Sequence, residues 1–153
     1  MNIEVIHKPL ISSHRKLIVV PCNHRRTSEH PIPIIRNRYP IAYSKYCRHV
    51  ECITRPDNII LTDRGSIIES KDLERIIVWF PVKRKHRDLP NLDWIKDSLE
   101  CMAERGLHKK YNIAFPAIGY YLESQQIDYW DVLGLIEDVF YDSGKSLDFH
   151  LSW

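Results

Sequence analysis

The loop after a strand predicted at residues 75–80 contains a lysine that could act as a nucleophile. Lys83 stands among further cations, namely Arg84, Lys85, His86 and Arg87. Neighbouring positive charges lower the pKa of a lysine, and its neutral amine can attack an electrophilic carbon. The alternative is a solvated basic loop that touches phosphate at most, and the spacing alone favours this second interpretation.

A second loop, which follows an apolar strand predicted at 112–118, combines a glycine, two tyrosines and a carboxylate. Gly119 lets the backbone turn sharply or approach a ligand closely. Tyr120 and Tyr121 could stack on a base or a ribose, although aromatic pairs in loops more often pack against the core. Glu123 could act as a general acid or orient a nucleophile, although an isolated glutamate is usually solvated.

The predicted elements explain how two such distant loops could come together. The strands at 75–80 and 112–118 are apolar throughout, as in strands that are covered on both faces. Apolar stripes predict helices at 92–102 and 128–140, and an alternating strand follows at 147–153. This alternation of strands and helices predicts an α/β fold with a mixed, mostly parallel sheet and helices on its faces. Ligands of such sheets bind outside the carboxyl ends of the strands, where both loops begin.

Residues with special backbone preferences mark where these elements should start and stop. Four of them are predicted to bound the two helices, Asn91 and Asp128 at the starts and Gly106 and Gly144 at the ends. Residues 58–62 and 66–69 are predicted to form a hairpin around Gly65.

The first fifty residues give a weaker pattern. Strands are predicted at 2–6 and at 16–20, the latter ending at Pro21. Several prolines predict a loop over 21–40, with a short helix at 34–38 or 41–48 as the alternatives.

Composition indicates one ordinary globular domain over residues 1–153. Hydrophobic residues make up 44% of the chain and charged residues 27%, and no run approaches the roughly 20 apolar residues of a membrane span. The N-terminus lacks the zones of a signal peptide, so we expect a cytoplasmic protein. The four cysteines form no CxxC pair, which predicts free thiols in a reducing compartment and no metal site.

The charges are unevenly distributed although the net charge is only +2. Basic residues cluster at 24–26, 36–38 and 83–87, and residues 128–142 are acidic without a lysine or arginine. Such polarity suits an anionic ligand at one end of the molecule, but many charge runs are simply solvated faces. Binding of nucleic acid is a third interpretation, and the small net charge argues against it as the main function.

Several motifs in the second half resemble the macrodomain family. Phe80-Pro81-Val82-Lys83 is similar to the strand that ends in Pro-Thr-Lys, and Pro116-Ala117-Ile118-Gly119 to its Pro-x-Ile-Gly motif. Residues 98–102 match the helix motif Ser-Leu-Glu-x-Met. The resemblance covers Val78 to Ser152 and is greatest to the ADP-ribosyl glycohydrolases that use a catalytic lysine. These include the terminal ADP-ribose protein glycohydrolases and the DNA ADP-ribosyl glycohydrolase antitoxins.

The first half fits the same family more loosely and departs from it at the ligand-binding positions. Ile18 to Asn23 resembles the second strand and its Asn-Pro-x-Asn signature, with Asn23 retained. The glycine-rich segment that normally cradles a diphosphate is replaced by residues 24–31, which contain no glycine. Tyr121 replaces a second glycine, and His7-Lys8-Pro9 occupies the place of the acid that reads adenine. The cations of the first segment would have to replace the lost backbone donors.

The resemblance implies a macrodomain-like three-layer sandwich that binds ADP-ribose or a related nucleotide and needs no cofactor. It also implies that Lys83 attacks the anomeric carbon of a ribose attached to protein or nucleic acid, with Glu123 assisting. The implied ligand-binding residues lie in the segment after the strand predicted at 16–20 and around the end of the strand predicted at 112–118: Asn23, Arg25, Arg26, Thr27, Ile118, Gly119, Tyr120 and Tyr121.

Loss of the glycines supports a second hypothesis, a degenerate macrodomain that binds or sequesters a nucleotide without turnover. Small divergent macrodomains also occur in phages, so a phage-encoded protein acting in the host cytoplasm is a further possibility.

Overall fold

The computed structural model describes residues 1–23, 31–53, 67–83, 91–118 and 127–153. In these residues six strands form one sheet in the order β1-β6-β5-β2-β4-β3. All neighbouring pairs are parallel except β3 and β4. The strands are β1 (Asn2–Pro9), β2 (Leu17–Asn23), β3 (Ile68–Asp72), β4 (Arg75–Lys83), β5 (Ile113–Pro116) and β6 (Ser146–Ser152).

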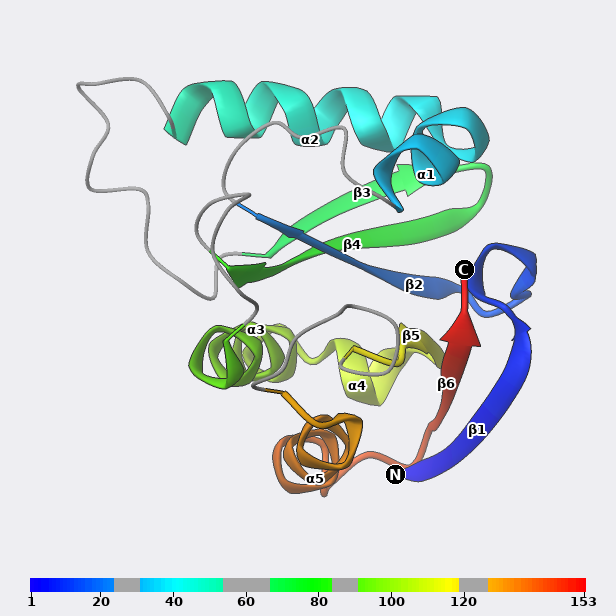
Figure 1. Cartoon of the computed structure of the whole chain (residues 1–153), viewed down its shortest axis with the longest axis vertical. Helices are drawn as coiled ribbons and strands as arrows, with labels where there is room; N and C mark the ends of the chain where they lie inside the picture. The colour runs from blue at the N-terminus through cyan, green and yellow to red at the C-terminus, as the bar shows by residue number, and fades with distance from the viewer. Residues whose placement is uncertain (24–30, 54–66, 84–90, 119–126) are drawn as a thin grey trace.

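Helices cover both faces of the sheet and make three layers (Figure 1). The helical elements are η1 (Leu10–Ser12), α1 (Ile32–Arg38), α2 (Pro40–Ile53), α3 (Leu92–Glu104), α4 (Leu107–Lys110) and α5 (Tyr129–Val139). One apolar core lies between the sheet and α3 and α5, and a second lies between the sheet and α1 and α2. The predicted three-layer α/β sandwich with a mixed, mostly parallel sheet is therefore confirmed.

The apolar strands are buried on both faces, as predicted. In β2, Leu17 and Val19 belong to the core under α3 and α5, while Ile18 and Val20 belong to the core under α1 and α2. A strand whose alternate side chains enter two cores cannot show a polar face, because every position is removed from water. Packing on both faces thus fixes the central strands, and these strands position the residues at their ends.

The starts of the two long helices of the second half agree with the prediction. Asn91 caps α3 by accepting a hydrogen bond from the Asp93 N–H at 2.7 Å, and Asp128 caps α5 in the same way. Gly106 follows α3 with a φ of +71°, a conformation that glycine adopts without strain. The end predicted at Gly144 is wrong, because α5 stops at Val139.

Ile32–Arg38 forms α1 and Pro40 begins α2, which corrects the loop predicted over 21–40 from its prolines; residues 21–23 of that range belong to β2. The two alternative helices are both present, as α1 and α2. Pro33 lies in the first turn of α1 and Pro40 is the first residue of α2, where a missing N–H costs no intrahelical hydrogen bond. The buried carboxylate of Asp72, in β3, accepts hydrogen bonds from two N–H groups at the start of α2.

The hairpin that the structure contains is a different one from the hairpin predicted at 58–69. It joins β3 to β4 through Leu73 and Glu74, which have φ values of 48° and 64°. Such a turn normally uses asparagine and glycine, so this sequence gave no signal for it. Most of the predicted hairpin lies outside the described residues.

The turn after α5 is tied to α4 by a small charge cluster. Asp142 contacts His108 Nε2 at 2.7 Å and Lys109 Nζ at 2.8 Å. The ring of His108 also stacks on Phe140, with centroids 5.0 Å apart. Hydrogen bonds from Lys109 first, and from His108 second, lower the pKa of Asp142 to about 2.

This cluster predicts a specific loss of stability in acid. The pKa of Asp142 is lowered by folding, so its contribution is present above the unfolded value of 3.8 and disappears as the pH falls towards about 2. The free energies of unfolding of the wild type and of Asp142→Asn, measured with urea, should therefore differ more at pH 5 than at pH 2, where the carboxyl is partly protonated in the folded state. An equal difference at both pH values would contradict the assignment.

No helix among the described residues has both the length and the apolar character needed to cross a membrane.

Candidate ligand-binding site

Three parallel strands have their carboxyl ends at the same end of the sheet, and we call these carboxyl ends the strand-end site. It consists of the ends of β2, β4 and β5, because β2 lies between the other two. Asn23 and Lys83 are aligned as Cα partners across β2 and β4. Ile118 follows β5 and is fully buried. The topology thus brings together Asn23 and Lys83, which are sixty positions apart in the sequence.

The pairing of β2 with β4 is irregular just before this point. Cys22 pairs with Pro81 but Asn23 pairs with Lys83, so Val82 is an extra residue in β4. Proline cannot donate to the ladder, and within a sheet it is confined to edges and bulges. The bulge moves Lys83 forward by one residue, which places it beside Asn23.

Cys22 also lies at the strand-end site but is not suited to act as a nucleophile. Its side chain is buried, and burial raises the pKa of its thiol far above the ordinary value. A protonated thiol in an apolar surrounding is unreactive. Of the titratable residues aligned here, Lys83 remains the candidate for covalent chemistry.

The structure brings together the backbones of Asn23 and Lys83. Ile118 is buried just after the end of β5. The other residues predicted for the site lie outside the described residues, namely Arg25, Arg26, Thr27, Gly119, Tyr120, Tyr121 and Glu123. Their predicted roles remain predictions. In the sequence, these residues follow Asn23 or Ile118 within a few positions.

The described residues contain no group of three or more histidine, cysteine or acidic side chains that could hold a metal ion.

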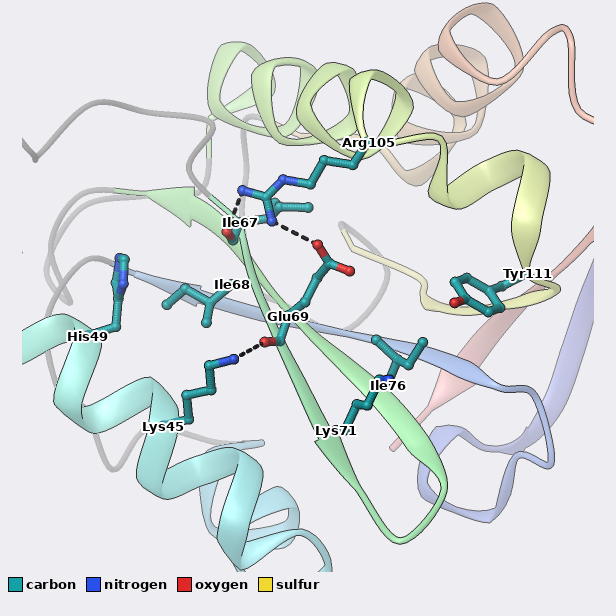
Figure 2. Close-up of a pocket in the computed structure, with 9 residues that line it drawn as sticks. All are labelled: Lys45, His49, Ile67, Ile68, Glu69, Lys71, Ile76, Arg105 and Tyr111. Carbon is teal, nitrogen blue, oxygen red and sulfur yellow. Dashed lines mark hydrogen bonds and ion pairs between the residues drawn. The ribbon is translucent and has the colours of Figure 1, made fainter.

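A groove of about 820 Å³ runs along the outer edge of β3 (Figure 2), and no sequence pattern predicted it. Its polar walls come from Lys45 and His49 of α2 and from Arg105 after α3. Lys45 Nζ donates to the carbonyl of Glu69 at 2.8 Å, and Arg105 donates to the carbonyl of Ile67 at 3.2 Å. Burial, and then the charge of Lys45, lower the pKa of His49, which favours its neutral form.

Lys45 and Arg105 donate hydrogen bonds to carbonyls in β3 and in the residue just before it. Within the described sheet, β3 has no neighbouring strand on the side opposite β4. Unpaired edges invite pairing with another chain, and long charged side chains prevent it. We therefore expect Lys45→Met/Arg105→Met to self-associate, because the apolar stems remain while the carbonyls are released. Size-exclusion chromatography with light scattering over a range of concentrations measures this.

The control for this prediction removes the same charge elsewhere. Lys96→Met/Lys110→Met replaces two exposed cations of α3 and α4 and should stay as monodisperse as the wild type. Both double variants should keep their free energy of unfolding within about 1 kcal/mol, since surface pairs contribute little. Identical elution of the two variants would contradict edge protection.

The fold defines the structural class of the protein. A mostly parallel sheet with helices on both faces is a three-layer α/β sandwich. The particular member of that class is the macrodomain, and the chain has the macrodomain fold.

Comparisons with solved structures carry this assignment. The macrodomain of Thermus aquaticus DarG superimposes with a TM-score of 0.80 at 15% identity, covering 99% of this chain and 98% of that one. The macrodomain of Mycobacterium tuberculosis DarG gives 0.74 at 17% identity, covering 96% of each chain. Thermosipho africanus DarTG in complex with ADP-ribose gives 0.76 at 13% identity, covering 97% of this chain but only 41% of that one. No protein-family model and no curated protein matches the sequence.

Proposed function

We propose that the chain binds ADP-ribose or a related nucleotide at the strand-end site and hydrolyses ADP-ribosyl linkages on protein or nucleic acid through Lys83. The observation that carries the proposal is the alignment of Asn23 with Lys83 at the end of two central strands. The macrodomain fold supports the ligand, because one structure of the same fold is a complex with ADP-ribose.

In the proposed reaction the neutral amine of Lys83 forms a bond to the anomeric carbon of the ribose while the bond to the modified group breaks. Glu123 donates a proton to the departing group and later takes one from the attacking water. Water then breaks the bond between Lys83 and the ribose. One water is consumed, and the products are free ADP-ribose, the restored target and the unchanged lysine.

The charge of the amine decides whether this step can occur at neutral pH. A carboxylate close to Lys83, such as Glu123, favours the ammonium form, whereas the cations Arg84 and Lys85 disfavour it. The proposal requires that the second influence prevails when substrate is bound.

The diphosphate must be held differently from the way glycine-rich loops hold it. Arg25, Arg26 and Thr27 follow Asn23 directly in the sequence and offer charged and hydroxyl donors. Arginine can bind two phosphate oxygens at once, so side chains can replace backbone amides with altered geometry.

The same absence of glycine favours a second candidate function, binding or sequestering of a nucleotide without turnover. Calorimetric titration with ADP-ribose and assay of ADP-ribose released from modified protein and modified DNA separate the two. Saturable binding with product formation supports the hydrolase, and binding without product from either substrate supports the second candidate. No binding of ADP-ribose at millimolar concentration would sink both.

A further inference from the structure

Two hydrogen bonds from α3 and its N-cap residue hold the carboxyl end of β4. The hydroxyl of Ser98 donates to the carbonyl of Pro81 at 2.8 Å, and the N–H of Asn91 donates to the carbonyl of Val82 at 2.9 Å. Asn91 is also the N-cap of α3, so the two donors are the cap and the body of one helix. Both acceptors belong to the bulge that immediately precedes Lys83.

Ser98 places a polar group on an otherwise apolar face. The side chain is fully buried, and its neighbours on the inner face of α3 are apolar: Ile95, Leu99 and Met102. Burial of a hydroxyl is unfavourable unless the hydroxyl is hydrogen-bonded. The carbonyl of Pro81 accepts that hydrogen bond, so the hydroxyl ties α3 to β4.

The consequence for Lys83 follows from the chain geometry. The bulge interrupts the regular ladder between β2 and β4, so β2 alone does not fix the direction in which β4 ends. The hydrogen bond from Ser98 supplies a constraint from a different layer, two residues before Lys83.

We propose that Ser98 is a positioning residue for Lys83: through the carbonyl of Pro81 it fixes where Lys83 leaves the sheet beside Asn23. The inference rests on the proposed function for its kinetic consequence. Its structural part, the control of Lys83 by a helix hydroxyl, does not need turnover.

The first test is kinetic. Ser98→Ala should lower kcat for ADP-ribose release by about 10- to 100-fold, because a small displacement of a reacting group has effects of this size. The Kd for ADP-ribose should stay within about twofold, since ligand binding uses other groups of the site. Ser98→Cys has a side chain of the same shape and a poorer donor, so its kcat should lie between those of the wild type and Ser98→Ala. It also provides a test if the alanine variant folds poorly.

The matched control is Ser143→Ala. Ser143 is also a buried serine whose hydroxyl donates to a main-chain carbonyl, that of His108, but it lies just before β6 and therefore at the opposite, amino end of the sheet. A similar loss of thermal stability is expected in Ser143→Ala, with no change in kcat. If both variants lose activity in proportion to stability, Ser98 is merely structural and the proposal fails.

The second test reads Lys83 directly and does not depend on catalysis. Lysines are methylated with ¹³C-formaldehyde, the Lys83 resonance is assigned with Lys83→Arg, and its titration is followed by NMR. Ser98→Ala should move the titration midpoint and chemical shift of Lys83, and Ser143→Ala should not. An unchanged Lys83 resonance in Ser98→Ala would overturn the inference, whether or not the wild type shows turnover. Absence of turnover in the wild type would refute the hydrolase alone.

Discussion

Replacement of Lys83 by alanine should reduce release of ADP-ribose from a modified substrate by at least about a thousandfold, the scale seen when a nucleophile is lost. Among the other residues that the structure describes at the strand-end site, none offers a reactive nucleophile, since burial keeps the thiol of Cys22 protonated. The Kd for ADP-ribose should change by less than about threefold, because Lys83 acts on the ribose bond and not on the diphosphate. Single-turnover assays with the product resolved by chromatography measure the first quantity, and calorimetry the second.

Two controls accompany this experiment. Lys83→Arg keeps the positive charge but removes a group that can become neutral near pH 7, so it should be as inactive as the alanine variant. Lys110→Ala removes an exposed lysine of α4 and should behave as the wild type. Undiminished turnover in Lys83→Ala would eliminate the proposed mechanism, and a loss of ADP-ribose binding of the same size as the loss of rate would assign Lys83 to binding.

Replacement of Phe115 by alanine should lower the free energy of unfolding by about 3–5 kcal/mol. Phe115 is fully buried in β5, with its ring edge-on to Phe80 of β4 at 5.4 Å and stacked with Phe149 of β6 at 6.2 Å. Its removal leaves a cavity shared by several strands, and neighbouring strands cannot close it without breaking their own pairing. Urea unfolding followed by circular dichroism gives the value.

The comparison for this variant is an aromatic residue on the surface. Tyr141 is 79% exposed, and Tyr141→Ala should change the free energy of unfolding by less than about 0.5 kcal/mol. A cost below about 1 kcal/mol for Phe115→Ala would mean that the core around β5 is not packed as described.

The sequence predicted the parts of the fold whose signal is local. Uninterrupted apolar runs identified β4 and β5, and a stripe with a polar cap identified α3. Prolines misled the interpretation of the part of 21–40 that forms α1 and begins α2, because a proline restricts a helix interior but favours its first turn. The start of α2 is stabilised by Asp72, which lies 30 residues further along the chain, and no local pattern could reveal that partner.

The residues of the candidate site also fall into those with a local sequence signal and those that depend on a distant partner. Lys83 and Ile118 were identified because the first follows, and the second ends, an apolar run that predicted a strand. The structure extends β4 to include Lys83, which the sequence placed in a loop, and the topology aligns Lys83 with Asn23. The contribution of Ser98 was not recognised as more than part of a motif, since its partner is a main-chain carbonyl on another element. The groove along β3 unites residues of α2, β3 and the end of α3, so it exists only after folding.

Binding of ADP-ribose at the strand-end site can be observed residue by residue when the ¹⁵N-labelled wild type is titrated with ADP-ribose. We expect the largest amide shift changes at Cys22, Asn23, Lys83 and Ile118, with little change along β3. Saturable shifts confined to the β3 groove, or no shifts at millimolar ADP-ribose, would contradict it.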